Sequence, residues 1–239
     1  MPYKRPSVRL VSLLPREPPI LHDIDIRTMA EQPSTNPFPP PHRIISTHDP
    51  ATGRAVFSDV DEKPPVGFMP NPNGGQQTIN MRMYTTTTFP VSGLSPRSEA
   101  TTEENANLDL KSYILNLDHP LAPDGSHPHQ TYCRMVDMPP GAEAPMHRTI
   151  ALDYGVVIDG VMEWELDSGE TRILKKGDVA VQRGTAHAWR NITPPEQNHG
   201  WARMFFVALS SEKVKVKDGR ELGYGFGLPR LGDSSKSPR

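Results

Sequence analysis

The chain has 239 residues, of which 26 are Lys or Arg and 28 are Asp or Glu, so its formal net charge is -2. A charge this close to zero gives no electrostatic basis for binding nucleic acid or an anionic membrane, and we expect neither as a partner. The single cysteine, Cys133, excludes an internal disulfide framework, and the lack of an apolar run of roughly 18 residues predicts a soluble, cytoplasmic protein.

Proline divides the chain, because 17 of its 27 prolines lie in the first hundred residues. Residues 1–28 are basic and poor in acids, as in a transit peptide, but their prolines oppose the amphipathic helix that such a peptide needs. We therefore predict a disordered extension over residues 1–28. Residues 29–107 predict a Pro-rich extended arm, whose short apolar pieces lie as edge strands on a larger body.

Strand signals are dense between residues 108 and 210 and predict an all-β fold, an antiparallel barrel or sandwich. The expected strands are residues 112–117, 131–138, 144–149, 154–158, 161–166, 171–174, 179–182, 188–191 and 202–209. Asp159-Gly160 is typical of a tight hairpin turn, since Asp-Gly tolerates positive φ. No stretch of this region shows a convincing helical period.

The last segment, residues 211–239, begins with the alternating lysines Lys213, Lys215 and Lys217. Such alternation is typical of the solvated face of an edge strand. The segment then becomes Gly-rich, and we expect its final residues to form a disordered tail.

Two segments combine glycines with residues that can do chemistry. His147 and Thr149 lie two positions apart, so on a strand they point to the same face, and Asp153 follows shortly after. His187 and Asn191 come from a later pair of strands that must pack against the first. One face of a small barrel would then carry two imidazoles and a carboxylate.

These segments resemble the two signature motifs of the cupin superfamily. The residues that match the first motif in spacing are Gly141, His147, Asp153 and Gly160. Those that match the second, with one residue fewer before its second glycine and no proline there, are Gly177, Gly184, His187 and Asn191. The resemblance implies a jelly-roll barrel of the double-stranded β-helix type, a homodimer and a small-molecule ligand.

The chain departs from the family at the metal ligands. Metal-binding cupins use three histidines and a glutamate, whereas Thr149 replaces the second histidine here and Asp153 replaces the glutamate. The remaining set of His147, His187 and Asp153 could imitate a 2-His-1-carboxylate centre. The resemblance thus leaves a divalent transition metal (zinc, iron or manganese) open as a cofactor, while the residues require none. The sequence contains no Gly-rich phosphate-binding loop, so we expect no nucleotide cofactor.

Four further residues are candidates for substrate binding: Thr149, Tyr154, Arg183 and Trp189. Arg183 could clamp a substrate carboxylate with two hydrogen bonds, although a surface ion pair is the commoner use of such an arginine. Tyr154 and Trp189 offer aromatic surfaces, although such residues more often belong to a core or its rim than to a substrate site. Asp153 could serve as a catalytic group or only anchor a turn.

The residues favour an enzyme that does acid–base chemistry on a small acid. His147 and His187 are suited to taking and returning a proton, with Asp153 accepting an imidazole N–H. The chain also resembles small cupins of fungal and bacterial secondary-metabolite gene clusters, which implies a dehydratase, decarboxylase or isomerase/cyclase acting on a polyketide-like or carboxylic acid. The alternatives are a non-catalytic small-molecule-binding cupin and a metal-dependent oxygenase.

Overall fold

A computed structural model describes residues 35–60, 63–71, 74–97, 104–115 and 131–232. The predictions for residues 1–28 and for the end of the C-terminal tail fall outside these ranges. In the described part of the chain, no helix is long and apolar enough to cross a membrane.

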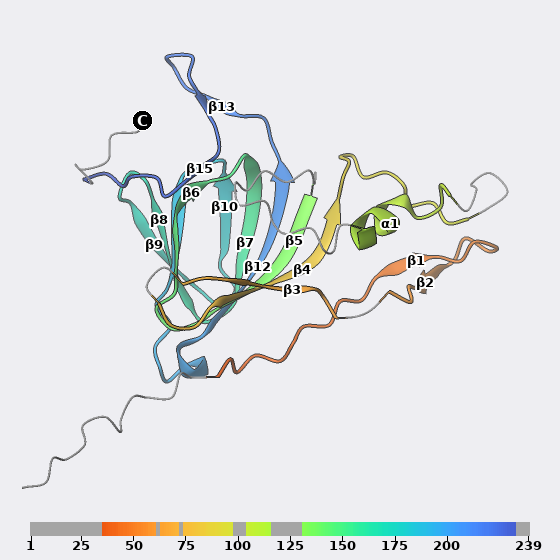
Figure 1. Ribbon diagram of the computed structural model, residues 1–239, viewed down its shortest axis with the longest axis horizontal. Coiled ribbons are helices and arrows are strands. Elements are labelled where there is room, and N and C mark those ends of the chain that lie inside the picture. The colour runs from red at the N-terminus through yellow and green to blue at the C-terminus, as the bar shows by residue number, and fades with distance from the viewer. Residues whose placement is uncertain (1–34, 61–62, 72–73, 98–103, 116–130, 233–239) are drawn as a thin grey trace, which may run out of the picture. The chain divides into compact units, whose positions relative to one another are not determined.

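Two antiparallel sheets face each other and enclose the core (Figure 1). The first has six strands, in the order β10 (Val179–Arg183), β7 (Ala151–Asp159), β12 (Ala202–Ser210), β5 (Thr131–Met138), β4 (Thr78–Thr86) and β3 (Val66–Met69). The second has five, in the order β15 (Gly225–Phe226), β6 (Glu143–Arg148), β11 (His187–Asn191), β8 (Val161–Leu166) and β9 (Thr171–Lys175). The prediction of an all-β barrel of the double-stranded β-helix type is confirmed.

Alternation along the strands fills the space between the sheets. On β5, Val136 and Met138 point inward. On β12, Met204 lies directly opposite Val136, and Phe206, two residues further along, points inward from the same face. The rest of the core consists of Ala142, Val157, Met162, Leu174, Ala180, Trp189 and Ala202. Side chains of a strand that are two residues apart share a face, so this core also fixes which polar residues must face inward.

The remaining elements lie outside the two sheets. They are the hairpin of β1 (Ser46–His48) and β2 (Ala55–Phe57), the helix α1 (Leu108–Leu115), the 3₁₀ turn η2 (Asn198–Gly200), and the hairpin of β13 (Val214–Lys215) and β14 (Glu221–Leu222). In Figure 1, α1 lies beside β4 and close to the β1–β2 hairpin.

The helix α1 replaces the first part of the strand predicted over residues 112–117, of which residues 116 and 117 lie outside the described ranges. A short apolar run fits a strand and a helix equally well, so periodicity alone does not decide between them. Asp109 lies in the first turn, where a negative charge suits the helix N-terminus. The buried ring of Tyr113 stacks on Tyr84 of β4, with 4.7 Å between ring centroids. This packing against the sheet favours the helix.

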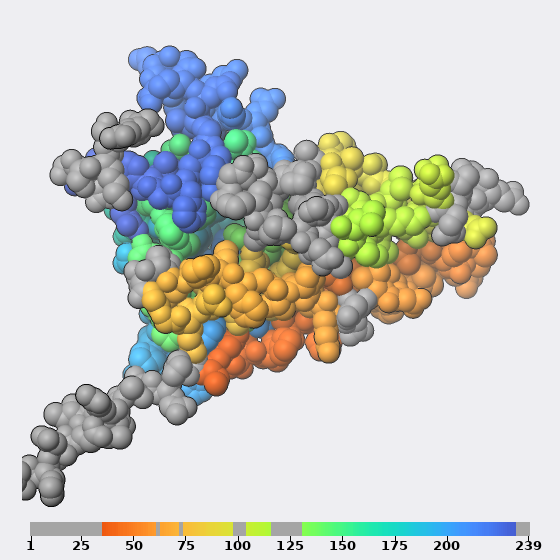
Figure 2. Space-filling model, viewed as in Figure 1, coloured from red at the N-terminus to blue at the C-terminus, as the bar shows by residue number. Residues whose placement is uncertain are grey.

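The arm contributes more to the barrel than edge strands. β3 is an edge strand and lies at the molecular surface (Figure 2), but β4 lies between β3 and β5 and pairs with both. The barrel sheet therefore begins before residue 108, the predicted start of the domain. β4 was not recognised as an inner strand because its pairing partner β5 is distant in sequence.

The turn at Asp159-Gly160 is not a hairpin. β7 and β8, which it joins, belong to different sheets, so the turn carries the chain across one end of the barrel. Gly160 has a φ of 95°, and a Cβ there would lie 2.7 Å from Thr193 Oγ1 and 2.8 Å from the Cα of Ala202. Close approach as well as backbone conformation therefore requires glycine at this position.

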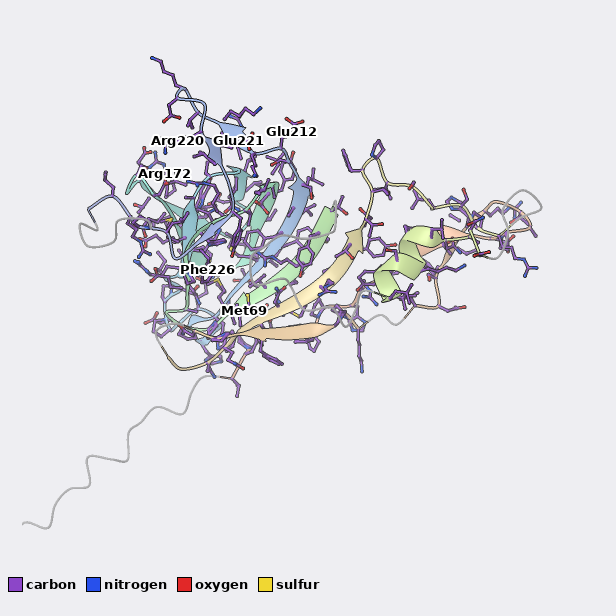
Figure 3. The ribbon with its side chains drawn as sticks, turned by 45° about the horizontal axis from the view of Figure 1, so that its top comes forward. Met69, Arg172, Glu212, Arg220, Glu221 and Phe226 are labelled. Carbon is purple, nitrogen blue, oxygen red and sulfur yellow. The ribbon has the colours of Figure 1, made fainter. Side chains whose placement is uncertain are left out.

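The lysine-rich segment contributes the exposed strand β13. This strand forms a separate two-stranded hairpin with β14, on which Arg220 and Glu221 are labelled in Figure 3. Glu221 lies 3.7 Å from the amines of both Lys213 and Lys215, so opposite charges pair within the hairpin. The C-terminal strand that joins the barrel is β15, which pairs with β6.

Candidate functional site

His147 and His187 lie side by side in the barrel. His147 is on β6 and His187 on β11, and the two are direct partners in the antiparallel register. Because directly opposed residues project from the same face, the rings meet, with 4.4 Å between their centroids. The structure thus brings together the two histidines that the sequence singled out.

Backbone carbonyls fix the orientation of both rings. The Nδ1 atom of His147 lies 2.7 Å from the carbonyl oxygen of Pro145, and that of His187 lies 2.9 Å from the carbonyl oxygen of Thr185. A carbonyl accepts only, so each Nδ1 carries the proton and each Nε2 presents a lone pair. Neither Nε2 hydrogen-bonds to another described residue. The pair therefore offers two basic nitrogens.

Both imidazoles are held neutral. Burial lowers the pKa of His147 to about 4, and the neighbouring His187 and the guanidinium of Arg134 act in the same direction. Burial also lowers the pKa of His187 to about 4, again with Arg134 contributing. Near pH 7 both imidazoles of the free protein are therefore unprotonated at Nε2, which leaves these nitrogens able to accept a proton.

Asp153 lies on β7 and faces inward, but its partners are not the predicted ones. Its Oδ2 accepts a hydrogen bond from Thr149 Oγ1 at 3.0 Å, and the side chain of Gln182 donates to it as well. Burial raises the pKa of this carboxyl against the opposing charge of Arg134. The idea that Asp153 accepts an imidazole N–H is wrong, because both Nδ1 atoms bind backbone carbonyls.

Trp189 is part of the core rather than an open binding surface. Its ring stacks on Trp164 at 5.5 Å and meets Phe206 edge-on at 6.0 Å. Its Nε1 donates to Gln182 Oε1 at 2.8 Å. Trp189, Gln182 and Asp153 thus form a hydrogen-bonded chain that ties the two sheets together beside the histidines.

Tyr154 and Arg183 do not line the site. Tyr154 follows the inward-facing Asp153 on β7, so alternation turns it outward, where it is 40% exposed. Arg183 follows the buried Gln182 on β10 and is likewise exposed on the outer face. Both expectations are corrected by strand parity, and Gln182 takes the inward place expected for Arg183.

Arg134 is the inward-facing cation that sequence reasoning missed. It lies on β5, two residues before the core residue Val136, and its guanidinium carbon lies 5.1 Å from the centroid of the Phe206 ring. Its charge acts on His147, His187 and Asp153 alike. The alternation of Tyr132, Arg134 and Val136 was a signal that could have identified it.

The C-terminal strand borders the site. Phe226 of β15 pairs in register with His147, and the ring centroids lie 6.3 Å apart. Phe226 remains largely exposed and is labelled in Figure 3. Leu228, just beyond it, packs on Met146, Ala186 and Ala188. This packing holds the C-terminal segment along the edge of β6.

The residues present do not fit a three-ligand metal centre. Within the described ranges, no group of three or more His, Cys, Asp or Glu side chains is arranged to hold a metal ion. The two imidazoles present suitable nitrogens, but Asp153 is engaged by Thr149 and Gln182. The predicted set of His147, His187 and Asp153 is therefore not assembled as a metal site.

The fold and the site together define a double-stranded β-helix barrel with histidines in its interior. The family profile described as the cupin domain matches residues 134–197. Phomopsin biosynthesis cluster protein C' of Diaporthe leptostromiformis is 41% identical over 199 residues, which are 83% of this chain and 91% of the relative. The chain belongs to the cupin family, which confirms the resemblance seen in its motifs.

Two further comparisons describe its relatives. Cupin-domain-containing oxidoreductase fogC of Aspergillus ruber is 39% identical over 183 residues, 76% of this chain and 78% of the relative. Among solved structures, the cupin domain of Schizosaccharomyces pombe Cnp3 shares 14% identity over 72% of this chain and 88% of that one, with a TM-score of 0.39. The relatives thus include proteins of biosynthesis clusters and cupin-domain oxidoreductases.

Proposed function

We propose that this protein is a tailoring enzyme of secondary metabolism that moves a proton on a small acidic substrate held inside the barrel. The observation that carries the proposal is the pair of neutral, oriented imidazoles, 4.4 Å apart, beside an inward-facing arginine. The names of the relatives, which include a biosynthesis cluster protein, support the metabolic setting.

The chemistry follows from the state of the two histidines. The Nε2 of His147 or His187 takes a proton from a carbon next to a substrate carbonyl and leaves an enolate. The resulting imidazolium returns the proton to another atom. Return to carbon gives an isomer, whereas transfer to a leaving hydroxyl releases water. Both outcomes balance without an oxidant, so the proposed class is isomerase or lyase.

An anionic substrate would help to move the proton. In the free protein the positive charge of Arg134 disfavours the imidazolium form of both histidines. A bound anion places a negative charge beside them and offsets Arg134, which raises the imidazole pKa toward the working pH. Substrate binding and proton abstraction would then be coupled. Asp153 and Gln182 hydrogen-bond to each other and hold the side chains of Thr149 and Trp189 in position.

Proton exchange with solvent tests this proposal without knowledge of the final product. The protein is incubated in D₂O with a panel of 3-oxo and 3-hydroxy carboxylic acids, and replacement of the hydrogens next to the carbonyl is followed by NMR. We expect catalysed exchange with at least one acid. His147→Ala and His187→Ala should each slow it about 10²- to 10⁴-fold, the usual worth of general acid–base catalysis.

Controls separate the barrel interior from the outer face. Tyr154→Phe and Arg183→Gln alter exposed residues and should leave exchange unchanged. Exchange that survives both histidine substitutions would contradict the acid–base role of the histidines, whereas the absence of catalysed exchange with every acid would favour a non-catalytic binding protein.

A second candidate function is that of an oxidoreductase, which the name of the Aspergillus ruber relative favours. Activity that is lost to a chelator, restored by one divalent ion and dependent on an oxidant would support this class over the acid–base enzyme.

A further inference from the structure

Two arginines face each other on the inner side of the first sheet. Arg82 of β4 and Arg134 of β5 are direct register partners, so they project from the same face. That face is the inner one, because the next register pair on it joins Asn80 with the core residue Val136. Arg82 is buried and Arg134 half-buried. The two guanidinium groups therefore lie on the same inner face of the sheet.

The partners of Arg134 leave its hydrogen-bonding groups available. The guanidinium lies over two rings, 5.9 Å from the centroid of Tyr132 and 5.1 Å from that of Phe206. It makes no hydrogen bond or ion pair with any other residue in the described ranges. Asp153 acts on it only through charge. The planar guanidinium group can thus donate two parallel hydrogen bonds to a carboxylate.

Asn80 supplies a second, independent sign of a ligand. Its side chain is 4% exposed and faces inward, and neither its amide nitrogen nor its amide oxygen has a hydrogen-bond partner. A buried amide without hydrogen-bond partners is unfavourable, because its groups have lost water and gained nothing in return. The indole nitrogen of Trp164, another buried donor of the barrel, is also unpartnered. Such groups are expected where a ligand completes the hydrogen bonds.

We propose that the barrel contains a binding site for a hydroxylated carboxylic acid, in which Arg134 holds the carboxylate beside Arg82 and the Asn80 amide holds the hydroxyl. A hydroxyl both donates and accepts, so it can satisfy the oxygen and the nitrogen of one amide. Residues diagonal to each other on paired strands lie about 7 to 8 Å apart, a separation that one small acid can span. The inference deepens the proposed function by naming its substrate class.

Calorimetric titration of the full-length protein tests the site. The probe is 3-hydroxybenzoate, compared with benzoate, which lacks the hydroxyl, and with 3-hydroxybenzamide, which lacks the charge. We expect wild-type protein to bind 3-hydroxybenzoate about 10- to 100-fold more tightly than the amide, and more tightly than benzoate. Arg134→Gln should remove the preference for the acid, and Asn80→Leu the preference for the hydroxyl.

Matched variants locate the binding and separate the two proposals. Arg183→Gln removes an exposed arginine of the outer face and should bind 3-hydroxybenzoate as wild type does. A His147→Gln/His187→Gln variant should retain binding within a few fold even if proton exchange is lost. Binding without exchange in the wild type would thus leave this site standing while the acid–base function fails.

Three results would overturn the inference: equal binding of acid and amide by the wild type, unchanged binding by a folded Arg134→Gln variant, or no saturable binding of 3-hydroxybenzoate. The acid–amide comparison uses wild-type protein alone, so it decides the matter even if a variant fails to fold.

Discussion

Arg203 of β12 and Asp137 of β5 form a buried, two-point ion pair on the outer side of the barrel sheet. Nε lies 2.6 Å from Oδ1, and Nη2 lies 2.7 Å from Oδ2. The N-terminal arm completes it: Asn36 Nδ2 donates to Asp137 Oδ2 at 2.7 Å, and Arg203 Nη1 donates to the carbonyl of Pro39 at 2.9 Å. The ring of Phe38 lies 4.8 Å from the guanidinium carbon. The pair therefore fastens the arm to the barrel.

Removing one partner of this pair should destabilise the protein strongly. Asp137→Ala leaves the buried guanidinium of Arg203 without its counter-charge, and we expect a loss of about 3 to 5 kcal/mol in the free energy of unfolding. Urea denaturation measures it. Lys176→Ala breaks the exposed pair with Asp159 and should lower stability by less than about 1 kcal/mol. Similar losses in both variants would argue against a special role for the buried pair.

Motif spacing located the histidines, because it determines which strands carry them and which face they share. His147 and His187 are register partners, as one site requires. Strand parity was the weaker part of the reasoning. Tyr154 adjoins the inward Asp153 and so had to face outward, while Arg134 shares the parity of the core residue Val136. Both facts were available in the sequence once the strands were placed.

Long-range pairing could not be predicted in the same way. The alternation of β4 shows that it is a strand, but nothing local in its sequence identifies β5 as its partner. The ion pair that fastens the arm joins residues 66 positions apart, and the Asn36 contact spans 101 positions. Such contacts depend on the assembled barrel. The pairing of β4 with β5 is what places the side chains of Arg82 and Asn80 on the inner face of the barrel.

Asn191 should be among the least replaceable residues of the barrel. Its Nδ2 lies 2.8 Å from each of the carbonyl oxygens of Met138, Pro139 and Gly200, and its Oδ1 accepts from the backbone N–H of Thr193 at 2.9 Å. Asn191→Ala leaves these buried backbone groups without hydrogen-bond partners and should lower the free energy of unfolding by about 3 kcal/mol or more. Asn191→Asp should be worse, since it sets a carboxylate against the carbonyls. Thermal unfolding of both variants tests this ranking, and a more stable Asp variant would contradict it.

Replacement of Gly155 by alanine should destabilise the protein, because even a methyl group does not fit there. A Cβ there would lie 2.8 Å from Cε1 of Phe206, whose ring is held in the core by Trp189. We expect Gly155→Ala to lower the free energy of unfolding by about 1 to 3 kcal/mol. Gly223→Ala is the matched control, because its Cβ meets nothing within 4 Å and should change stability by less than about 0.5 kcal/mol. Adding Phe206→Leu should recover part of the loss only if the clash is its cause.

The two histidines should make the protein sensitive to acid. Their pKa values fall from an ordinary 6.5 to about 4 on folding, so between pH 6.5 and pH 4 the unfolded chain binds more protons than the folded one. Their contribution is therefore undiminished above pH 6.5 and is lost as the pH falls toward 4. The raised pKa of Asp153 acts oppositely, because protonation of that buried carboxyl favours the folded state.

The expected loss for the histidine pair is on the order of 3 to 6 kcal/mol between pH 6.5 and pH 4. Urea denaturation at half-unit pH intervals gives the profile for the wild type. His147→Gln/His187→Gln removes both imidazoles while keeping polar side chains of similar reach, and its profile should be distinctly flatter over this range. Parallel profiles for the two proteins would show that other groups cause the acid sensitivity and that the imidazoles are not held neutral by the barrel.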